Sequence, residues 1–258
     1  MRYFIELNYD GSRFHGWQSQ DNAESIQEII ETGLRYKIGF TGRIIGCGRT
    51  DAGVHASNFY AHFDHENEFD AFTLDKITFS LNRYLPNEIA ALRIFRVKED
   101  AHVRFDAVAR TYKYFILNKK DPFLLRYSWL LPEIPAFDLM NETSRILLEY
   151  NDFTSFSKLH SDARTNICKI HHAGWEKYNN QLVFTITADR FLRNMVRAIV
   201  GTLVEVGMGK RSPGNFRKVI EAKNRNEAGV SAPANGLFLH EVTYNWNEIL
   251  PANTSPEP

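Results

Sequence analysis

The chain has 258 residues, 43% of them hydrophobic and 24% charged, and its 31 basic and 31 acidic side chains give a formal net charge of zero at pH 7. This composition is typical of a globular protein, and no apolar run approaches the roughly 18 residues that a membrane-spanning helix needs. Glu6 lies where a signal peptide needs its apolar core, and the two cysteines, Cys47 and Cys168, indicate neither a disulfide framework nor a structural zinc. The sequence therefore predicts a cytoplasmic protein without a membrane span.

The first hundred residues alternate between strand and helix signals. Apolar side chains at every second position predict a half-buried strand over residues 2–10, and the capping box that begins at Ser25 predicts a helix to about Ile38. Thr73 is the predicted cap of a second helix that ends near Tyr84. Further strands are predicted over residues 44–47, 56–63 and 89–97. The order strand, helix, strand, strand, helix, strand is the split βαβ or ferredoxin-like arrangement.

The second half of the chain begins near Arg104 and contains similar elements. Strands are predicted over 111–117, 169–177, 182–189 and 237–244, and helices over 139–150, from Asp152, over 191–206 and from Ser212 to about 223. We therefore predict an α+β fold of two ferredoxin-like or RRM-like halves, residues 1–103 and 104–248. Together they form a mostly antiparallel mixed sheet flanked by helices, with a central cleft. Residues 249–258 are predicted to be a disordered tail.

Charges are distributed unevenly along the chain. Residues 102–126 contain six Lys or Arg against two acids, and residues 186–218 contain seven against two, whereas residues 59–75 contain five acids and no Lys or Arg. If the two basic segments meet in space, they form a positive surface on a protein of zero net charge. Two unrelated solvated faces explain the same charges equally well.

A glycine-rich turn between two predicted strands carries Asp51, in the segment Gly48-Arg49-Thr50-Asp51-Ala52-Gly53-Val54-His55-Ala56. Glycine lets the backbone turn sharply and lets a ligand approach closely. Arg49 can shape the field at the carboxylate and bind an anion. An Asx-type turn explains the tripeptide Arg-Thr-Asp without any function, so other motifs must decide the role of Asp51.

The segment over residues 109–116 includes most of the strand predicted over 111–117, which places Tyr112 and Tyr114 on one face and has basic neighbours, among them Arg110. This pattern suits base stacking combined with phosphate contact. Aromatic side chains on a strand also fill ordinary cores, and this second interpretation is stronger for Tyr114 than for Tyr112.

Three arginines, Arg190, Arg193 and Arg197, follow helical 3,4 spacing and are predicted to lie on one face of the helix that begins at Phe191. Most such stripes are the solvated face of an amphipathic helix. A stripe that ends near a carboxylate can instead keep that acid ionised. Arg197 lies deepest along the apolar helix and needs an anionic partner if it is buried.

Weaker candidates carry no clear chemistry. His62, Asp64 and His65 resemble metal ligands, but alternation along a strand places His62 and Asp64 on one face and His65 on the other. His171 and His172 are separated in the same way. Cys47 is interpreted as a small buried residue rather than a nucleophile. The sequence contains no P-loop, Gly-x-Gly-x-x-Gly or Gly-x-Ser-x-Gly pattern, so we expect neither a nucleotide cofactor nor serine-hydrolase chemistry.

Several segments together resemble the tRNA pseudouridine synthase A family, in the family's order and over about residues 3–244. The matching segments are Tyr9-Asp10-Gly11-Ser12 with Phe14-His15-Gly16-Trp17-Gln18, Ser25-Ile26-Gln27, the Gly48–Ala56 loop, Arg110-x-Tyr112-x-Tyr114, Asp152-Phe153-x-Ser155-Phe156, the helix from Phe191-Leu192 to Arg197, and Pro233-x-x-Gly236-Leu237. One departure is Ser19, where a basic residue often follows Trp-Gln.

The resemblance implies an enzyme that isomerises uridine to pseudouridine at positions 38, 39 and/or 40 in the anticodon stem-loop of tRNA. It implies that Asp51 is the catalytic aspartate, Tyr112 the active-site tyrosine, Arg49 the arginine that assists base flipping, and Arg197 the partner of the aspartate. With these, Arg110, Arg190 and Arg193 are expected substrate contacts. The family is a homodimer that needs neither cofactor nor metal.

The residue types fit this chemistry, because an isomerisation consumes no cofactor and an ionised carboxylate can act as nucleophile or base. The sequence leaves open whether Asp51 attacks C1′, attacks C6 of the base or removes a sugar proton. Two other functions remain alternatives: a non-enzymatic RNA-binding module, which leaves Asp51 without a role, and a metal-dependent hydrolase that uses His55, His62 and Asp64.

Overall fold

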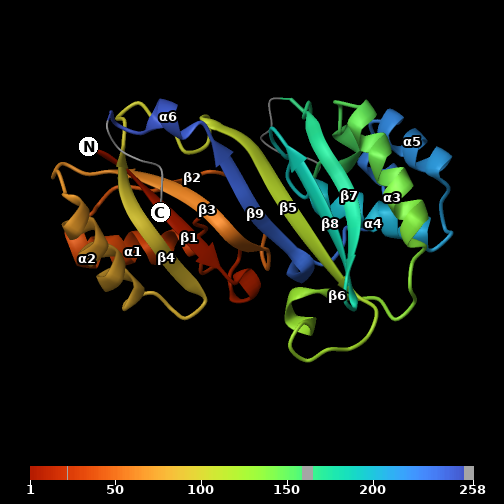
Figure 1. Cartoon of the computed structure of the whole chain (residues 1–258), viewed down its shortest axis with the longest axis horizontal. Coiled ribbons are helices and arrows are strands. Elements are labelled where there is room, and N and C mark those ends of the chain that lie inside the picture. Colours follow the sequence, from red (N-terminus) through yellow and green to blue (C-terminus); the bar gives the residue numbers. More distant parts are fainter. Residues whose placement is uncertain (22, 159–164, 253–258) are drawn as a thin grey trace. The chain divides into compact units, whose positions relative to one another are not determined.

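The computed structural model describes residues 1–21, 23–158 and 165–252, which form two compact units (Figure 1). Unit 1 comprises Met1–Val108 and the segment from Leu239, and unit 2 comprises Ala109–Phe238. The strand β9 (Leu237–Tyr244) therefore begins in unit 2 and ends in unit 1. The predicted domain boundary between residues 103 and 104 remains a prediction.

Unit 1 has the ferredoxin-like order of elements. They are β1 (Arg2–Tyr9), the 3-10 turn Gly11–Arg13, α1 (Ile26–Ile38), β2 (Ile45–Gly46), β3 (His55–Asp64), α2 (Ala71–Asn82), β4 (Ile89–Val97), the end of β9, and α6 (Trp246–Ile249). The strands of this unit follow the order β4-β1-β3-β9, and β2 also pairs with β3. The pairs β1–β3, β1–β4 and β2–β3 are antiparallel.

The helices α1 and α2 of unit 1 begin at polar caps. The Ser25 hydroxyl accepts a hydrogen bond from the Glu28 amide, as the capping box predicts, and Gly39 ends α1 in the left-handed conformation at φ 71°. The prediction that Thr73 caps the second helix is wrong, because the Asp70 carboxylate accepts the Thr73 amide 2.9 Å away. Both Asp and Thr are good N-caps, so sequence alone placed this start three residues too late.

The predicted core face of β1 is confirmed, since Tyr3, Ile5, Leu7 and Tyr9 are all buried. Phe4 points to the other face and is also buried, against the rings of His62, Phe95 and Tyr244. The segment that covers Phe4 comes from the far end of the chain, and a pattern read along β1 gives no sign of it.

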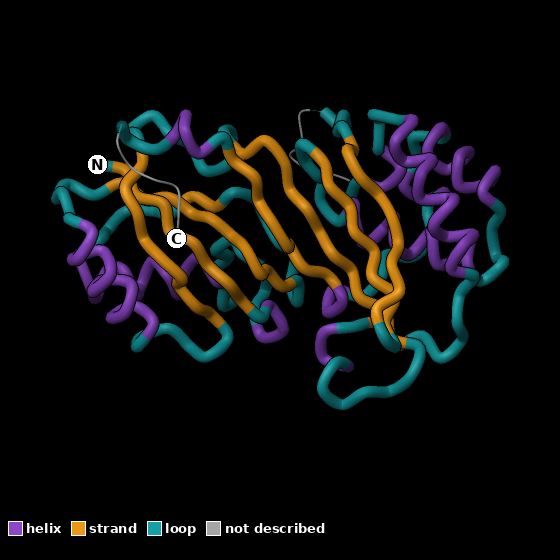
Figure 2. The backbone as a smooth tube through the Cα atoms, in the orientation of Figure 1, coloured by secondary structure: helices purple, strands orange, loops and turns teal. Residues whose placement is uncertain are grey.

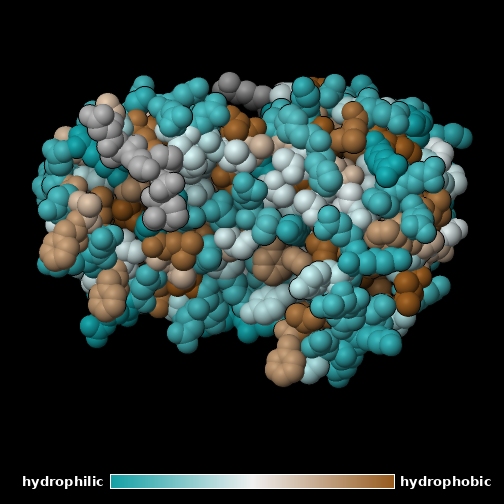
Figure 3. Space-filling view, in the orientation of Figure 1, coloured by the Kyte–Doolittle hydropathy of each residue, from teal (hydrophilic) through white to brown (hydrophobic). Residues whose placement is uncertain are grey.

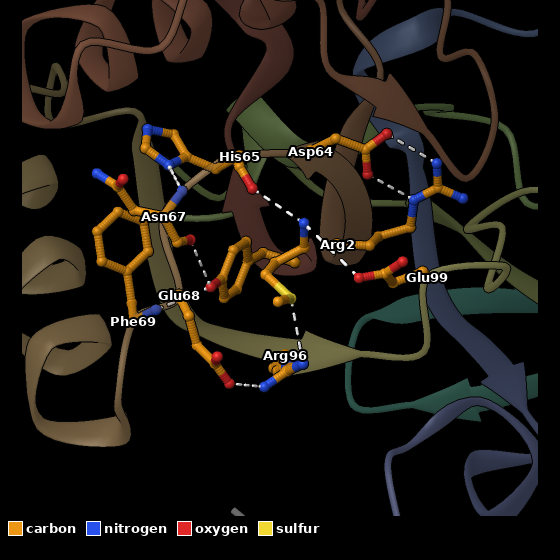
Figure 4. Close-up of polar contacts among 10 residues, drawn as sticks. Arg2, Asp64, His65, Asn67, Glu68, Phe69, Arg96 and Glu99 are labelled. Atoms are coloured by element: carbon orange, nitrogen blue, oxygen red, sulfur yellow. Dashed lines mark hydrogen bonds and ion pairs between the residues drawn. The ribbon is translucent and has the colours of Figure 1, made fainter.

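Polar contacts fasten the ends of the strands in unit 1 (Figure 4). The Arg2 guanidinium forms two hydrogen bonds with the Asp64 carboxylate, at 2.7 and 2.8 Å. Arg96 pairs with Glu68, and the Tyr3 hydroxyl donates to the Asn67 carbonyl and accepts from the Phe69 amide. These contacts lock the register of β1 against its neighbours on both sides.

In unit 2 the strands β5, β8 and β7 pair antiparallel in this order, the short strand β6 pairs parallel with β5, and helices flank these strands (Figure 2). Its elements are β5 (Ala107–Leu117), the 3-10 turn Leu125–Tyr127, β6 (Trp129–Leu130), α3 (Phe137–Arg145), the 3-10 turns Ile146–Glu149 and Thr154–Phe156, β7 (Ile170–Tyr178), β8 (Gln181–Ala188), α4 (Met195–Gly207), α5 (Pro213–Glu221), and the 3-10 turns Arg225–Glu227 and Ala234–Gly236. α3 packs on both α4 and β7.

The protein thus has the predicted α+β class, with a mostly antiparallel sheet flanked by helices. None of the helices in the described residues reaches the length and hydrophobicity of a membrane span. Of the predicted C-terminal tail, residues 253–258 lie outside the described residues.

The arginine stripe predicted before and along α4 is wrong for two of its three members. α4 begins at Met195, and Asn194 precedes it with φ 65°, in the left-handed region, so no helix extends back to Arg190 or Arg193. The Asp189 carboxylate accepts hydrogen bonds from the Lys169 and Arg190 amides, and the Lys158 amide donates to the Arg193 carbonyl. These bonds satisfy the backbone in an irregular conformation that spacing alone does not reveal.

Candidate active site

The loop that carries Asp51 connects β2 and β3 in unit 1. Arg49 is exposed, Thr50 is buried and Asp51 is half-buried. The Asp51 carbonyl accepts the Val54 amide at 3.1 Å, and Gly53 adopts φ 77°, a conformation that favours glycine. The predicted tight turn is therefore present, and it leaves the Asp51 carboxylate partly accessible.

A second loop, residues 10–17, fixes the backbone of the Asp51 loop. The Thr50 carbonyl accepts the Trp17 amide at 3.2 Å, the Thr50 hydroxyl bonds the Tyr9 hydroxyl at 2.9 Å, and the Gly53 amide donates to the Phe14 carbonyl. The carboxylate is thus presented from a backbone held by fixed neighbours rather than from a free loop, which is the condition for a positioned catalytic group.

Two glycines of this second loop are required by close approach. A Cβ on Gly11 would lie 2.0 Å from the Val54 carbonyl oxygen, and a Cβ on Gly16 would lie 2.4 Å from the Thr50 carbonyl oxygen. Gly16 also has φ 92°. Both residues belong to the segments that resemble the family, and the sequence alone indicates no role for them. Their role is to let the two loops touch backbone to backbone.

Replacing Gly16 by Ala is expected to reduce any activity that depends on Asp51 at least about tenfold, because the new methyl must displace Thr50 and with it the neighbouring Asp51, and small misplacements of a reacting group cost this much or more. The matched control is Gly39→Ala, which meets the same positive-φ penalty at φ 71° but has nothing within 4 Å of the new Cβ. Single-turnover rates, measured beside thermal melts, should fall for the first variant only. Equal activity of the two variants would contradict the proposed clamp.

His55, the first residue of β3, is buried beneath this pair of loops. Its Nδ1 lies 3.1 Å from the Gly11 amide nitrogen, which donates to it, and 3.1 Å from the Asp10 carboxylate. Asp10 in turn accepts the Ser12 amide. His55 is therefore a support of the loop pair, a role that the sequence analysis missed.

In unit 2, Tyr112 and Tyr114 lie on the same face of β5 and differ in exposure, as expected. Tyr114 is fully buried and donates its hydroxyl proton to the Pro233 carbonyl at 2.8 Å, and burial raises the pKa of this phenol. Tyr112 is half-buried and meets Phe191 edge to face, with ring centroids 5.0 Å apart. Tyr114 is thus part of the core, whereas Tyr112 has ring surface available to a ligand.

The arginines of unit 2 occupy three different settings. Arg110 donates to the Asp189 carbonyl at 2.8 Å and is half-buried, as is Arg190, while Arg193 is exposed. Arg197, in the first turn of α4, is half-buried and donates from Nε to the Ala232 carbonyl at 2.7 Å. The Arg197 carbonyl accepts the Ala232 amide, so backbone and side chain both hold this residue against one segment. Its guanidinium has a fixed direction.

The predicted site residues therefore fall into two groups. Asp51 and Arg49 belong to unit 1, and the structure places them in one loop. Tyr112, Arg110, Arg190, Arg193 and Arg197 belong to unit 2. Their meeting with Asp51 stays a prediction.

The residues that resembled metal ligands have structural partners. The His62 ring accepts the Val103 amide at 3.2 Å. Asp64 pairs with Arg2, and His65 accepts the Asn67 amide (Figure 4). Across the described ranges, no three His, Cys, Asp or Glu side chains are grouped so as to hold a metal ion. Cys47 is buried, as interpreted from the sequence.

His62 makes the stability of the protein depend on pH. Burial and the nearby Arg2 lower the pKa of its imidazole to about 4 from the ordinary 6.5. Between these pH values the unfolded chain binds a proton that the folded chain does not, so the free energy of unfolding should fall by up to about 3 kcal/mol as pH drops from 6.5 to 4. Urea melts over this range should show a shallower dependence for His62→Asn, which keeps an acceptor for the Val103 amide. An equally steep dependence would contradict this assignment.

Comparisons with known proteins assign this arrangement to a class. A family model described as tRNA pseudouridine synthase matches residues 149–245. A relative from Bacteroides fragilis is 55% identical over 244 residues, which cover 94% of this chain and 96% of the relative. Relatives from Clostridium acetobutylicum and Maricaulis maris are 38% and 35% identical, over 93% and 94% of this chain and 98% of each relative. All three relatives are named tRNA pseudouridine synthase A.

These matches define the class of the protein as a pseudouridine synthase, which is an isomerase. The chain belongs to the tRNA pseudouridine synthase A family. The alternative of a non-enzymatic RNA-binding module is therefore wrong, and so is that of a metal-dependent hydrolase, whose three residues serve as structural contacts.

Proposed function

We propose that the protein converts uridine to pseudouridine in tRNA, at positions 38, 39 and/or 40 of the anticodon stem-loop, with Asp51 as the catalytic carboxylate. The observation that carries the proposal is the backbone clamp on the Asp51 loop. Three hydrogen bonds from residues 9–17 fix the loop, while Asp51 stays half-buried. A surface Asx turn needs no such support.

The reaction breaks the C1′–N1 bond, rotates the uracil and forms a C1′–C5 bond. The proton leaves C5 for solvent and N1 gains one, so atoms and electrons balance without a cofactor, and an ionised carboxylate suffices as nucleophile or base. Asp51 supplies that group. Attack on C1′, attack on C6 and removal of a sugar proton are all compatible with this role.

The target uridine must leave its stack to reach Asp51, at a cost of a few kcal/mol. Arg49 is exposed two residues before Asp51, which suits a side chain that takes the place of the extruded base. Tyr112 offers a half-buried ring, fixed by its edge-to-face contact with Phe191, for stacking on the base or for moving its proton. Arg110, Arg190 and Arg193 then bind phosphates.

The proposal also pairs Asp51 with the Arg197 guanidinium, whose positive charge would stabilise the negative charge of the carboxylate. We further propose that the enzyme acts in the cytoplasm as a homodimer, both by analogy with the family.

The direct experiment incubates the protein with tRNA that carries 5-tritiated uridine. Forming the C1′–C5 bond releases the tritium to water. Release from tRNA that contains uridine at positions 38–40, and none from tRNA with these positions replaced by cytidine, is the expected result. Release that is independent of these positions would overturn the site assignment, and no release at all would overturn the function.

A further inference from the structure

The loop that follows β5 in unit 2 carries the most exposed aromatic ring of the described residues. Phe123 is 86% exposed, more than any other large hydrophobic side chain described here. Figure 1 shows this yellow-green segment extending away from the strands of unit 2. Hydrophobic residues are scattered over the surface in Figure 3, and single ones need no explanation. Phe123 needs one because of its neighbours and its support.

The neighbours of Phe123 in the chain are basic. Lys119, Lys120 and Arg126 are all exposed, against the single carboxylate of Asp121. That carboxylate accepts the Phe123 amide at 2.9 Å and so takes part in forming the turn. The loop therefore presents a ring among cations, which is the combination that binds single-stranded nucleic acid through stacking and phosphate contact.

The loop is held rigidly although its tip is exposed. The Asp121 carbonyl oxygen accepts hydrogen bonds from the Leu124 and Leu125 amides. These bonds close one compact turn that contains Phe123. The Asn235 amide donates to the Ser128 carbonyl at 3.0 Å, and Gln181 donates to the Ser128 hydroxyl. A turn whose backbone is already ordered by hydrogen bonds loses little conformational entropy when a base stacks on its side chain.

The same support connects the loop to the candidate active site of unit 2. Asn235 lies in the segment 232–236, where the Ala232 carbonyl fixes Arg197 and the Pro233 carbonyl fixes Tyr114. A Cβ on Gly236 would lie 2.8 Å from the Phe115 carbonyl oxygen, so this segment packs directly on β5. One rigid segment thus sets the positions of both Arg197 and the Phe123 loop.

We infer that Phe123 and its flanking cations, Lys119, Lys120 and Arg126, form a second RNA contact, in which Phe123 stacks on an unpaired base of the tRNA other than the reacting uridine. This inference rests on the proposed function for the identity of the RNA. The contact adds affinity and orientation but touches no reacting atom. Phe123 is therefore a binding residue, and its loss should raise Kd and KM without lowering kcat.

The experiment measures tRNA binding by the full chain with Phe123→Ala, Phe123→Trp and Phe79→Ala. Phe79 is the matched control, an exposed ring on α2 of unit 1. Phe123→Ala should weaken binding about 5- to 100-fold, the range for one lost base–aromatic stack, while Phe123→Trp and Phe79→Ala bind as wild type. The double variant Lys119→Ala/Lys120→Ala should lower the slope of log K against log salt concentration by about 1.5.

Three results would overturn the inference. The first is unchanged tRNA binding by Phe123→Ala. The second is a lower kcat of this variant at saturating tRNA with an unchanged Kd. The third is a change in its oligomeric state in sedimentation without RNA, which would mean that a second copy of the chain covers the ring. The binding measurement does not depend on turnover. If the wild-type protein binds tRNA through Phe123 but releases no tritium, the proposed function is wrong and the inference about Phe123 still holds.

Discussion

Replacing Asp51 by Asn is expected to abolish pseudouridine formation, with a loss of roughly 10⁴-fold or more, as for other variants that lack a catalytic nucleophile. Affinity for tRNA should remain. Asn has the size of Asp, and hydrogen bonds of the backbone and of the Thr50 hydroxyl hold the loop. The change therefore removes charge and nucleophilicity and leaves the loop in place.

The measurement compares tritium release with filter-binding affinity for the same tRNA. Asp70→Asn is the matched control, since it makes the same chemical change at a carboxylate that caps α2, and Asn caps a helix as well as Asp does. It should retain full activity. Turnover by Asp51→Asn at the wild-type rate would end the assignment of Asp51.

Local signals predicted the elements of the fold well because each is set by neighbours in the chain. The Ser25 cap, the alternation along β1 and the strand over residues 89–97 all appear as expected. Contacts from distant segments were not predictable in this way. Phe4 is buried by rings that lie as far along the chain as Tyr244, and α4 begins late because its upstream backbone bonds to other loops.

The same distinction between local signals and distant contacts applies to the candidate site. The residue types and the resemblance predict Asp51, Tyr112 and Arg197 as site residues, which stays a prediction. The structure confirms that the core role belongs to Tyr114 rather than Tyr112. The supports of the Asp51 loop were missed. Gly16 and His55 act through a backbone approach and a buried ring nitrogen, which become visible only when the two loops are seen together.

Removing the Arg197 guanidinium is expected to slow isomerisation about 10²- to 10³-fold at pH 7, the scale for losing one preorganised electrostatic contact. In the proposed site this guanidinium stabilises the negative charge of the Asp51 carboxylate. The loss should therefore appear in the single-turnover rate at saturating tRNA. A merely structural role would lower the thermal stability of the protein together with the rate.

Two variants make this prediction specific. Arg197→Lys keeps a charge but cannot both replace the Nε bond to Ala232 and reach a carboxylate as a planar fork does, so it should recover only part of the rate. Arg193→Ala removes an exposed charge outside the helix, and should weaken tRNA binding while leaving the single-turnover rate at saturating tRNA unchanged. If Arg197→Ala reacts at the wild-type rate, the pairing of the two residues is wrong.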